Sequence, residues 1–242
     1  MIRAWVRVLA LIGLVLVCVP PHLLVRAMGR DSRWPRRFLT MAGRLCGLRV
    51  DIAGQPLTQD VFLVSNHVSW LDILALAGAT GCAFVARDDM GKWPVIGWLA
   101  AQNNTILVNR GERGTVQSQI GTVRSAMARH QPITLFPEGT TGDGHSLLPF
   151  KPALFAVLLP PPRAIRVQPV LIDYGADTDA IAWIDDEPGG ANAMRVLARR
   201  GGTHVTLRFL APFDPGDHPD RKAIAAQARA QLDTEIRSFR NA

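Results

Sequence analysis

Cysteine is scarce in this chain of 242 residues, and the three cysteines, Cys18, Cys46 and Cys82, lie far apart. Disulfide frameworks and structural zinc sites both need cysteines at characteristic paired spacings. The sequence therefore predicts neither, and reduced thiols in a protein that faces the cytosol are the simpler interpretation. The composition, 48% hydrophobic, argues against a disordered or collagen-like chain. It provides for a sizeable core in one domain, or in one domain with an appendage.

Acidic residues are almost absent from residues 1–49, which contain nine arginines and a single acid, Asp31. The net charge of this segment is therefore +8, whereas residues 50–242 contain eighteen basic and nineteen acidic residues, a net charge of −1. A nucleic-acid-binding protein would more often carry its positive charge on the folded domain. Because the positive charge here follows an apolar run, it indicates an anionic membrane surface as the partner, and no nucleic acid.

Charged residues are missing altogether between Val8 and Pro21, a run of fourteen residues. A helix that crosses a bilayer perpendicularly needs about 20 apolar residues, so the run is short for a span. The pattern of a signal-peptide cleavage site does not follow it, and Trp5 and Trp34 suit a membrane–water interface. We therefore expect residues 1–49 to form a membrane-anchoring basic and apolar helical segment, as a short span or as a helix that enters one leaflet. A helical hairpin packed on the domain is the alternative.

Residues 50–242 alternate between short runs rich in β-branched residues and stretches with helical periodicity. This alternation predicts an α/β domain in which helices flank a largely parallel sheet, and in such sheets ligands bind at the carboxyl ends of the strands. Residues 185–193 are expected to form a surface loop. The candidate strands are residues 61–64, 83–86, 105–108, 133–136, 165–172 and 204–209. The candidate helices are residues 116–127, 154–159 and 224–236.

A histidine and an aspartate follow the first of these strands, in the stretch SNHVSWLD at residues 65–72. Residues five apart on a regular helix point about 140° away from each other. His67 and Asp72 can therefore meet only if the chain turns between them, and Asn66 and Ser69 favour a turn before the helical run WLDILALA. A carboxylate bound to one imidazole nitrogen leaves the other nitrogen free to act as a general base. A capping turn with a satisfied histidine is the alternative.

No serine or cysteine in a nucleophile-elbow context accompanies the pair, which suits activation of a substrate hydroxyl. A second polar stretch, ITLFPEGTTGDG, follows the candidate strand at residues 133–136. Its glycines let the backbone approach a ligand closely, and its threonines offer hydroxyl groups. Cations at a strand end or in an apolar setting suit phosphate binding, although each residue here could instead be a solvated loop residue. The candidate binding residues are Glu138, Gly139, Thr140, Thr141, Arg110 and Lys151.

Four blocks of the sequence, NHVSWLD, ILVNR, FPEGTT and VQPVLID, resemble in order and spacing those of the glycerolipid acyltransferase family. The resemblance covers residues 55–175 and is most specific in the first and third blocks. Bacterial members of the family include 1-acyl-glycerol-3-phosphate acyltransferases. The resemblance implies that His67 is the base and that Asp72 orients it. It also implies that Arg110, Glu138 and Gly139 belong to the blocks that bind the acceptor.

The sequence departs from the commonest family pattern at three positions. Thr141 stands where arginine is frequent, Asn109 where an acidic residue is common, and Arg87 where lysine is usual. The variant FPEGTT with LPFK also resembles bacterial acyltransferases that act on lyso-ornithine lipid, which carries no glycerol phosphate. Arg87, Arg110 and Lys151 still provide cations that could hold a phosphate.

The resemblance implies transfer of a fatty acyl group from acyl-CoA or acyl carrier protein to the hydroxyl of a lysophospholipid. We expect 1-acyl-sn-glycerol-3-phosphate as the acceptor, with phosphatidic acid as the product, and lyso-ornithine lipid as the alternative acceptor. No metal, bound cofactor or covalent acyl-enzyme is expected. The catalytic domain, residues 50–242, is expected at the cytoplasmic face of the inner membrane. Two other classes stay open: an acyl thioesterase, in which the pair activates water, and a lipid-binding module without catalysis.

Overall fold

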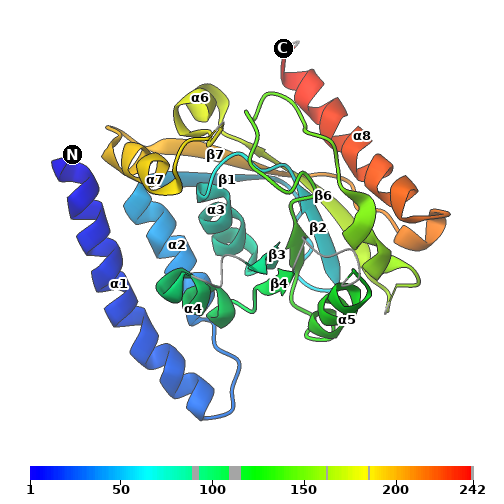
Figure 1. The fold of residues 1–242 in the computed structure, drawn as a ribbon, viewed down its shortest axis with the longest axis horizontal. Helices are drawn as coiled ribbons and strands as arrows, with labels where there is room; N and C mark the ends of the chain where they lie inside the picture. The colour runs from blue at the N-terminus through cyan, green and yellow to red at the C-terminus, as the bar shows by residue number, and fades with distance from the viewer. Residues whose placement is uncertain (89–92, 109–115, 162, 185, 241–242) are drawn as a thin grey trace.

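A computed structural model of the protein describes residues 1–88, 93–108, 116–161, 163–184 and 186–240. In this described part of the chain, seven strands form one sheet in the order β1-β7-β6-β2-β5-β3-β4 (Figure 1). The strands are β1 (Leu48–Gly54), β2 (Val61–Ser65), β3 (Ala83–Arg87), β4 (Ile106–Val108), β5 (Ile133–Leu135), β6 (Arg166–Asp173) and β7 (Thr203–Phe209).

The sheet is largely parallel, as predicted, because every neighbouring pair except β6 and β7 is parallel. The carboxyl ends of β2, β3, β4, β5 and β6 therefore lie at the same edge. All five residues of the central strand β2 are buried, as is usual for a strand with neighbours on both sides and helices on both faces. We refer to the edge formed by these carboxyl ends as the carboxyl edge of the sheet.

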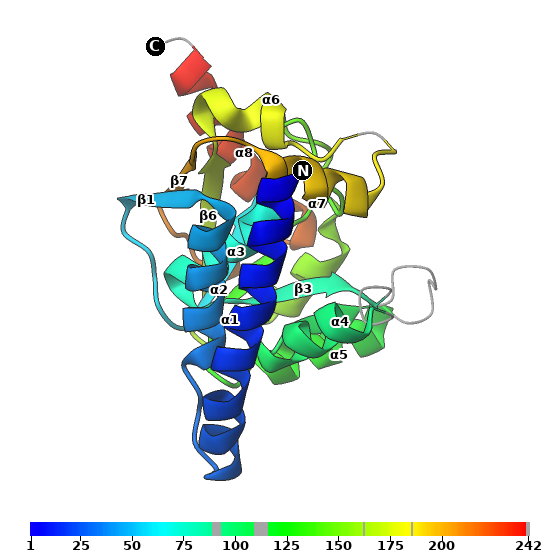
Figure 2. The same ribbon diagram turned by 90° about the vertical axis from the view of Figure 1, so that its left-hand side faces the viewer.

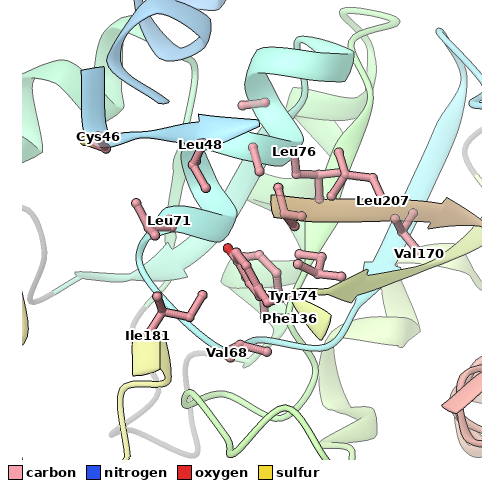
Figure 3. Packing of buried hydrophobic residues seen from close by; sticks show 14 of the residues in the cluster. Cys46, Leu48, Val68, Leu71, Leu76, Phe136, Val170, Tyr174, Ile181 and Leu207 are labelled. Atoms are coloured by element: carbon pink, nitrogen blue, oxygen red, sulfur yellow. The ribbon is translucent and has the colours of Figure 1, made fainter. Parts of the chain in front are cut away.

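Helices cover both faces of the sheet, and the side chains of β2 alternate between two cores. Val61 and Leu63 belong to the core beneath α3 and α7, part of which is drawn in Figure 3. Phe62 and Val64 belong to the core beneath α5, α8 and the 3-10 helix η3. This confirms the predicted α/β layering. The helices are α1 (Ile2–Ala27), α2 (Trp34–Cys46), α3 (Leu71–Thr80), α4 (Pro94–Gln102), α5 (Val116–Met127), η3 (Pro152–Leu158), α6 (Thr178–Ile181), α7 (Gly189–Ala198) and α8 (Arg221–Arg240).

All six predicted strands are present, but β1 was not among them. Among the residues that the structure describes, it is an edge strand that pairs with β7 alone, and it spans the boundary expected between residues 49 and 50. The expectation of a surface loop at residues 185–193 is wrong over its second half, because α7 begins at Gly189. Two adjacent glycines hide this helix start in the sequence. The buried residues Asn192, Val196 and Leu197 hold the helix on the core.

The first two helices form a hairpin whose tip points away from the sheet (Figure 2). Helix α1 is 26 residues long, about 39 Å at 1.5 Å per residue, and it continues through Pro20 and Pro21. It is thus longer than the uncharged run from which it was predicted. Its length, and a mean hydropathy of 2.5 over an 18-residue stretch within it, are sufficient by length and composition for a helix that crosses a membrane. Helix α1 packs against α2 and α7, and α2 packs against α3.

Candidate active site

The chain is pinned to β6 where it leaves β2 at the carboxyl edge. The hydroxyl of Ser65 donates to the carbonyl of Val170 at 2.7 Å. The side-chain amide of Asn66 donates to the carbonyl of Ile172 at 3.0 Å and accepts from its N–H at 2.8 Å. All these groups are buried, where a hydrogen bond is costly to lose. The next residue, His67, therefore starts from a fixed backbone position.

Asp72 lies in the first turn of α3, and four donors converge on its carboxylate. Nδ1 of His67 donates to Oδ2 at 2.7 Å, and the N–H groups of Val68 and Ser69 donate to the same oxygen at 2.7 and 3.0 Å. The hydroxyl of Tyr174 donates to Oδ1 at 2.6 Å. The Asp72 side chain is 0% exposed, so these donors replace the water that a carboxylate otherwise needs.

The predicted turn between His67 and Asp72 is present, and the two side chains meet across it. The turn is closed mainly by Asp72, since the Ser69 hydroxyl accepts only a long 3.4 Å bond from the N–H of Leu71. A carboxylate can only accept, so the neutral imidazole carries its proton on Nδ1 and leaves Nε2 as a proton acceptor. The His67 side chain is 19% exposed. The buried pair therefore reaches solvent only through the imidazole.

His67 is also held by a ring stacked on its imidazole and by a hydrogen bond from its backbone N–H. It stacks on Phe136, the residue after β5, with ring centroids 4.1 Å apart. The Glu138 carboxylate accepts the N–H of His67 on Oε1 at 3.1 Å and the N–H of Leu148 on Oε2 at 2.8 Å. Glu138 is buried, and burial raises its pKa from 4.5 to about 7, against the opposing effect of the two backbone N–H bonds. The carboxyl ends of β2 and β5 are thereby joined.

Comparisons with known proteins identify the family of the chain. The model of the acyltransferase family matches residues 49–173, more than half of the chain.

The chain belongs to the acyltransferase family.

Its relatives include a lyso-ornithine lipid O-acyltransferase of Rhodobacter capsulatus, 33% identical over 87% of this chain and 82% of the relative. A protein of the same name from Rhizobium meliloti is 34% identical over 91% of this chain and 82% of the relative. A 1-acyl-sn-glycerol-3-phosphate acyltransferase of Neisseria meningitidis serogroup B is 36% identical over 74% and 70%. The predicted enzyme class, an O-acyltransferase, is confirmed by the family and by these names.

The fold is also shared with a solved acyltransferase. The crystal structure of the 1-acyl-sn-glycerophosphate acyltransferase of Thermotoga maritima matches with a TM-score of 0.71, over 99% of this chain and 97% of that one. The identity is only 20%, so this likeness concerns the fold alone.

The loop after β5 brings several of the predicted binding residues to the candidate site. Gly139 has a φ of +77°, a conformation that favours glycine. The N–H of Gly142 donates to the His67 carbonyl at 2.7 Å, which attaches the loop to the candidate base. The Thr140 side chain is exposed. The hydroxyl of Thr141 instead donates to the carbonyl of Trp183 at 2.5 Å, so it holds two loops together.

The three predicted phosphate-binding cations differ in where the structure places them. Arg87 is the exposed last residue of β3, at the same edge of the sheet as His67. Lys151 is exposed and directly precedes η3, and its N–H donates to the Pro137 carbonyl at 2.8 Å. Arg110 lies outside the described residues. Within the described ranges, no group of three or more His, Cys, Asp and Glu side chains could hold a metal ion.

Tyr174, which contacts the candidate dyad directly, is not among the residues predicted from the sequence. It is the only tyrosine of the chain and follows immediately after the fourth block, VQPVLID; that position was the available signal. The residue is buried, and Figure 3 shows its ring among apolar side chains of the core. Burial, together with the neighbouring Asp72 carboxylate, raises the pKa of the hydroxyl well above its usual range. Tyr174 therefore stays a hydrogen-bond donor at any physiological pH.

Proposed function

We propose that this acyltransferase moves a fatty acyl group from acyl-CoA or acyl carrier protein to the free hydroxyl of a lysophospholipid. The observation that carries the proposal is the buried Asp72 carboxylate bound at 2.7 Å to Nδ1 of a partly exposed His67. This arrangement leaves Nε2 as a base on a residue that follows β2 at the carboxyl edge. In α/β sheets this edge is where ligands bind.

The reaction follows from that geometry. Nε2 of His67 removes the proton of the acceptor hydroxyl while its oxygen attacks the thioester carbonyl. The tetrahedral intermediate collapses to the new ester, and the departing thiolate takes the proton back from the imidazolium. Asp72 stabilises the positive charge that the ring carries in between. Tyr174 and Glu138 do not touch the substrates in this scheme; they position Asp72 and the His67 backbone.

The oxyanion of the intermediate needs donors other than the amides next to His67. The N–H groups of His67, Val68 and Ser69 already donate to the carboxylates of Glu138 and Asp72. We therefore place the oxyanion donors elsewhere on the carboxyl edge, with the backbone of residues 140 and 141 as the first candidates.

Two acceptor head groups remain in the proposal. The first is glycerol phosphate, for which Arg87, Arg110 and Lys151 would be the phosphate-binding cations. The second is the ornithine head group, which two observations favour. The relatives named lyso-ornithine lipid O-acyltransferase match 84–93% of the chain, against 74–75% for the two Neisseria proteins. In addition, the Thr141 hydroxyl is engaged by Trp183 at the position where arginine is frequent in the family.

A competition assay decides between the head groups. The purified protein is incubated with acyl-CoA or acyl carrier protein and an equimolar mixture of both acceptors, and the products are identified by mass spectrometry. Release of free fatty acid at the turnover rate without any acceptor would instead identify a thioesterase. Absence of both activities in the wild-type protein would favour a lipid-binding module.

His67→Ala tests the base itself, and the chain contains a matched control. His130 also binds an aspartate, Asp60, with Nδ1 2.8 Å from Oδ1, but it lies before β5, at the opposite edge of the sheet. His67→Ala should abolish transfer, by about 10²-fold or more, whereas His130→Ala should keep it. A fully active, folded His67→Ala protein would exclude the proposed chemistry.

The membrane seat that we propose uses one face of α1, with the catalytic domain on the cytoplasmic side of the inner membrane. Leu9, Leu16 and Leu23 are seven residues apart, share one face of the helix and are exposed. Leu14, Cys18 and His22 lie on the opposite face and are buried. Arg7 also binds the Leu197 carbonyl of α7 at 3.0 Å. A helix with one face held by α2 and α7 and the opposite face apolar and exposed is better suited to lie in one leaflet than to cross the bilayer.

A further inference from the structure

We propose that α4 is a second membrane-contacting element, which lies in the same leaflet as the outer face of α1. The helix Pro94–Gln102 has the sequence PVIGWLAAQ, without a charged residue, and none of its residues is buried. Val95 is 65% exposed and Trp98 is 40% exposed, and Trp93, just before the helix, is 57% exposed. A surface helix of a soluble domain normally buries an apolar stripe and presents polar residues outward. Helix α4 does neither.

The helix is attached to the hairpin that we propose as the membrane seat. Nε2 of His22 in α1 lies 3.0 Å from Oε1 of Gln102, the last residue of α4. Nδ1 of the same histidine lies 2.9 Å from the hydroxyl of Ser32, in the connection between α1 and α2. His22 is buried by these contacts. Figures 1 and 2 both show α4 beside α1.

A lipid bilayer fits this surface better than a protein partner does. The α4 surface has no charge or side-chain carboxylate for a specific protein contact, and its two tryptophans suit the head-group region of a membrane. Exposed arginines lie at the tip of the hairpin to which α4 is attached, where they can meet anionic lipid phosphates. They are Arg26, Arg30 and Arg33.

This placement gives the acceptor a route to the site. Helix α4 lies between β3 and β4 in the chain. The chain therefore reaches the first residues of α4 from the carboxyl end of β3, at the edge of the sheet where Arg87 and His67 lie. A bilayer in contact with Trp93 and Val95 therefore reaches the edge at which the acceptor must present its hydroxyl. A lysolipid need not leave the leaflet completely before it meets His67. This inference rests on the proposed membrane seat and on the proposed acceptor.

The test is binding of the full-length protein to phosphatidylcholine vesicles that contain phosphatidylglycerol. Val95→Asp adds a charge to α4 without disturbing a buried contact, and it should raise the apparent Kd by about tenfold or more. Ile52→Asp is the matched control, since Ile52 is 50% exposed on β1, at the far end of the sheet. It should change the Kd by less than about threefold. Equal vesicle affinity of Val95→Asp and wild type would overturn the proposal.

Three further measurements separate the other outcomes. Transfer to an acceptor dispersed in detergent should be unchanged in Val95→Asp, whereas its loss in His67→Ala reports on the proposed chemistry alone. Analytical ultracentrifugation compares the oligomeric state of the wild type with that of Val95→Asp. If the wild type is a dimer and the variant a monomer, the partner of α4 is a second copy of the chain and the proposal is overturned. Trp98→Phe keeps the surface apolar and should lower the fraction of tryptophan fluorescence that brominated lipids quench. An unchanged fraction would place Trp98 outside the bilayer and contradict the proposal.

Discussion

Glu138→Gln tests whether the buried Glu138 carboxylate supports His67, and it makes a prediction about pH. Burial raises the Glu138 pKa from 4.5 to about 7. Between these pH values the folded protein binds a proton that the unfolded chain has released, so stability falls as the pH rises. The contribution is fully present below pH 4.5 and is lost above pH 7. A pKa difference of this size corresponds to at most about 3 kcal/mol.

The glutamine variant is neutral at every pH, so this part of the pH dependence should disappear. Its amide oxygen can accept only one of the two backbone N–H groups, from His67 or from Leu148. The other faces an NH₂ group, which costs about 1–3 kcal/mol. The difference in the free energy of unfolding between wild type and variant should therefore be larger at pH 5 than at pH 8, by up to about 3 kcal/mol.

Chemical denaturation in detergent at a series of pH values measures this difference. Glu187→Gln is the control, because Arg195 lowers the pKa of Glu187 to about 2, outside the window, and the slope between pH 4.5 and 7 should persist. Glu138→Gln should also lower kcat by about tenfold or more, since a displaced base reacts slowly. Parallel pH profiles of wild type and Glu138→Gln would refute the reasoning.

Three further substitutions test the site. Tyr174→Phe removes one donor from the buried Asp72 and should lower the free energy of unfolding by about 1.5–3 kcal/mol. The loss of kcat should be smaller than in His67→Ala, because the contact between Asp72 and His67 remains. A stability equal to wild type would contradict this. Thr141→Val should lower stability by about 1 kcal/mol and leave the acceptor KM unchanged, whereas a raised KM would show substrate binding by its hydroxyl. Lys151→Ala should raise the KM for 1-acyl-sn-glycerol-3-phosphate and not for lyso-ornithine lipid, with exposed Lys222→Ala as the control; equal KM values would remove Lys151 from the phosphate site.

Local sequence patterns were sufficient for the elements and for one contact of the site. Strands β2 to β7 follow from short runs of buried, β-branched residues, and their alternation with helices dictates a layered α/β domain. The contact between His67 and Asp72 also follows from the sequence, because a spacing of five demands a turn and Asn66 and Ser69 favour one. Edge strand β1 and the start of α7 were missed. The strand pairs on one side only, and two glycines conceal the helix.

The remainder of the site depended on the order of the strands. Tyr174 reaches Asp72 across 102 residues of chain, and Glu138 reaches the N–H of His67 across 71. Both contacts exist because β6 and β5 flank β2, and nothing in the local pattern specifies which strands become neighbours. The same limit applies to α4, whose apolar sequence suits a buried helix as well as an exposed one. Hydrophobic periodicity reports the face that a segment can bury, and only the assembled sheet decides what lies against that face.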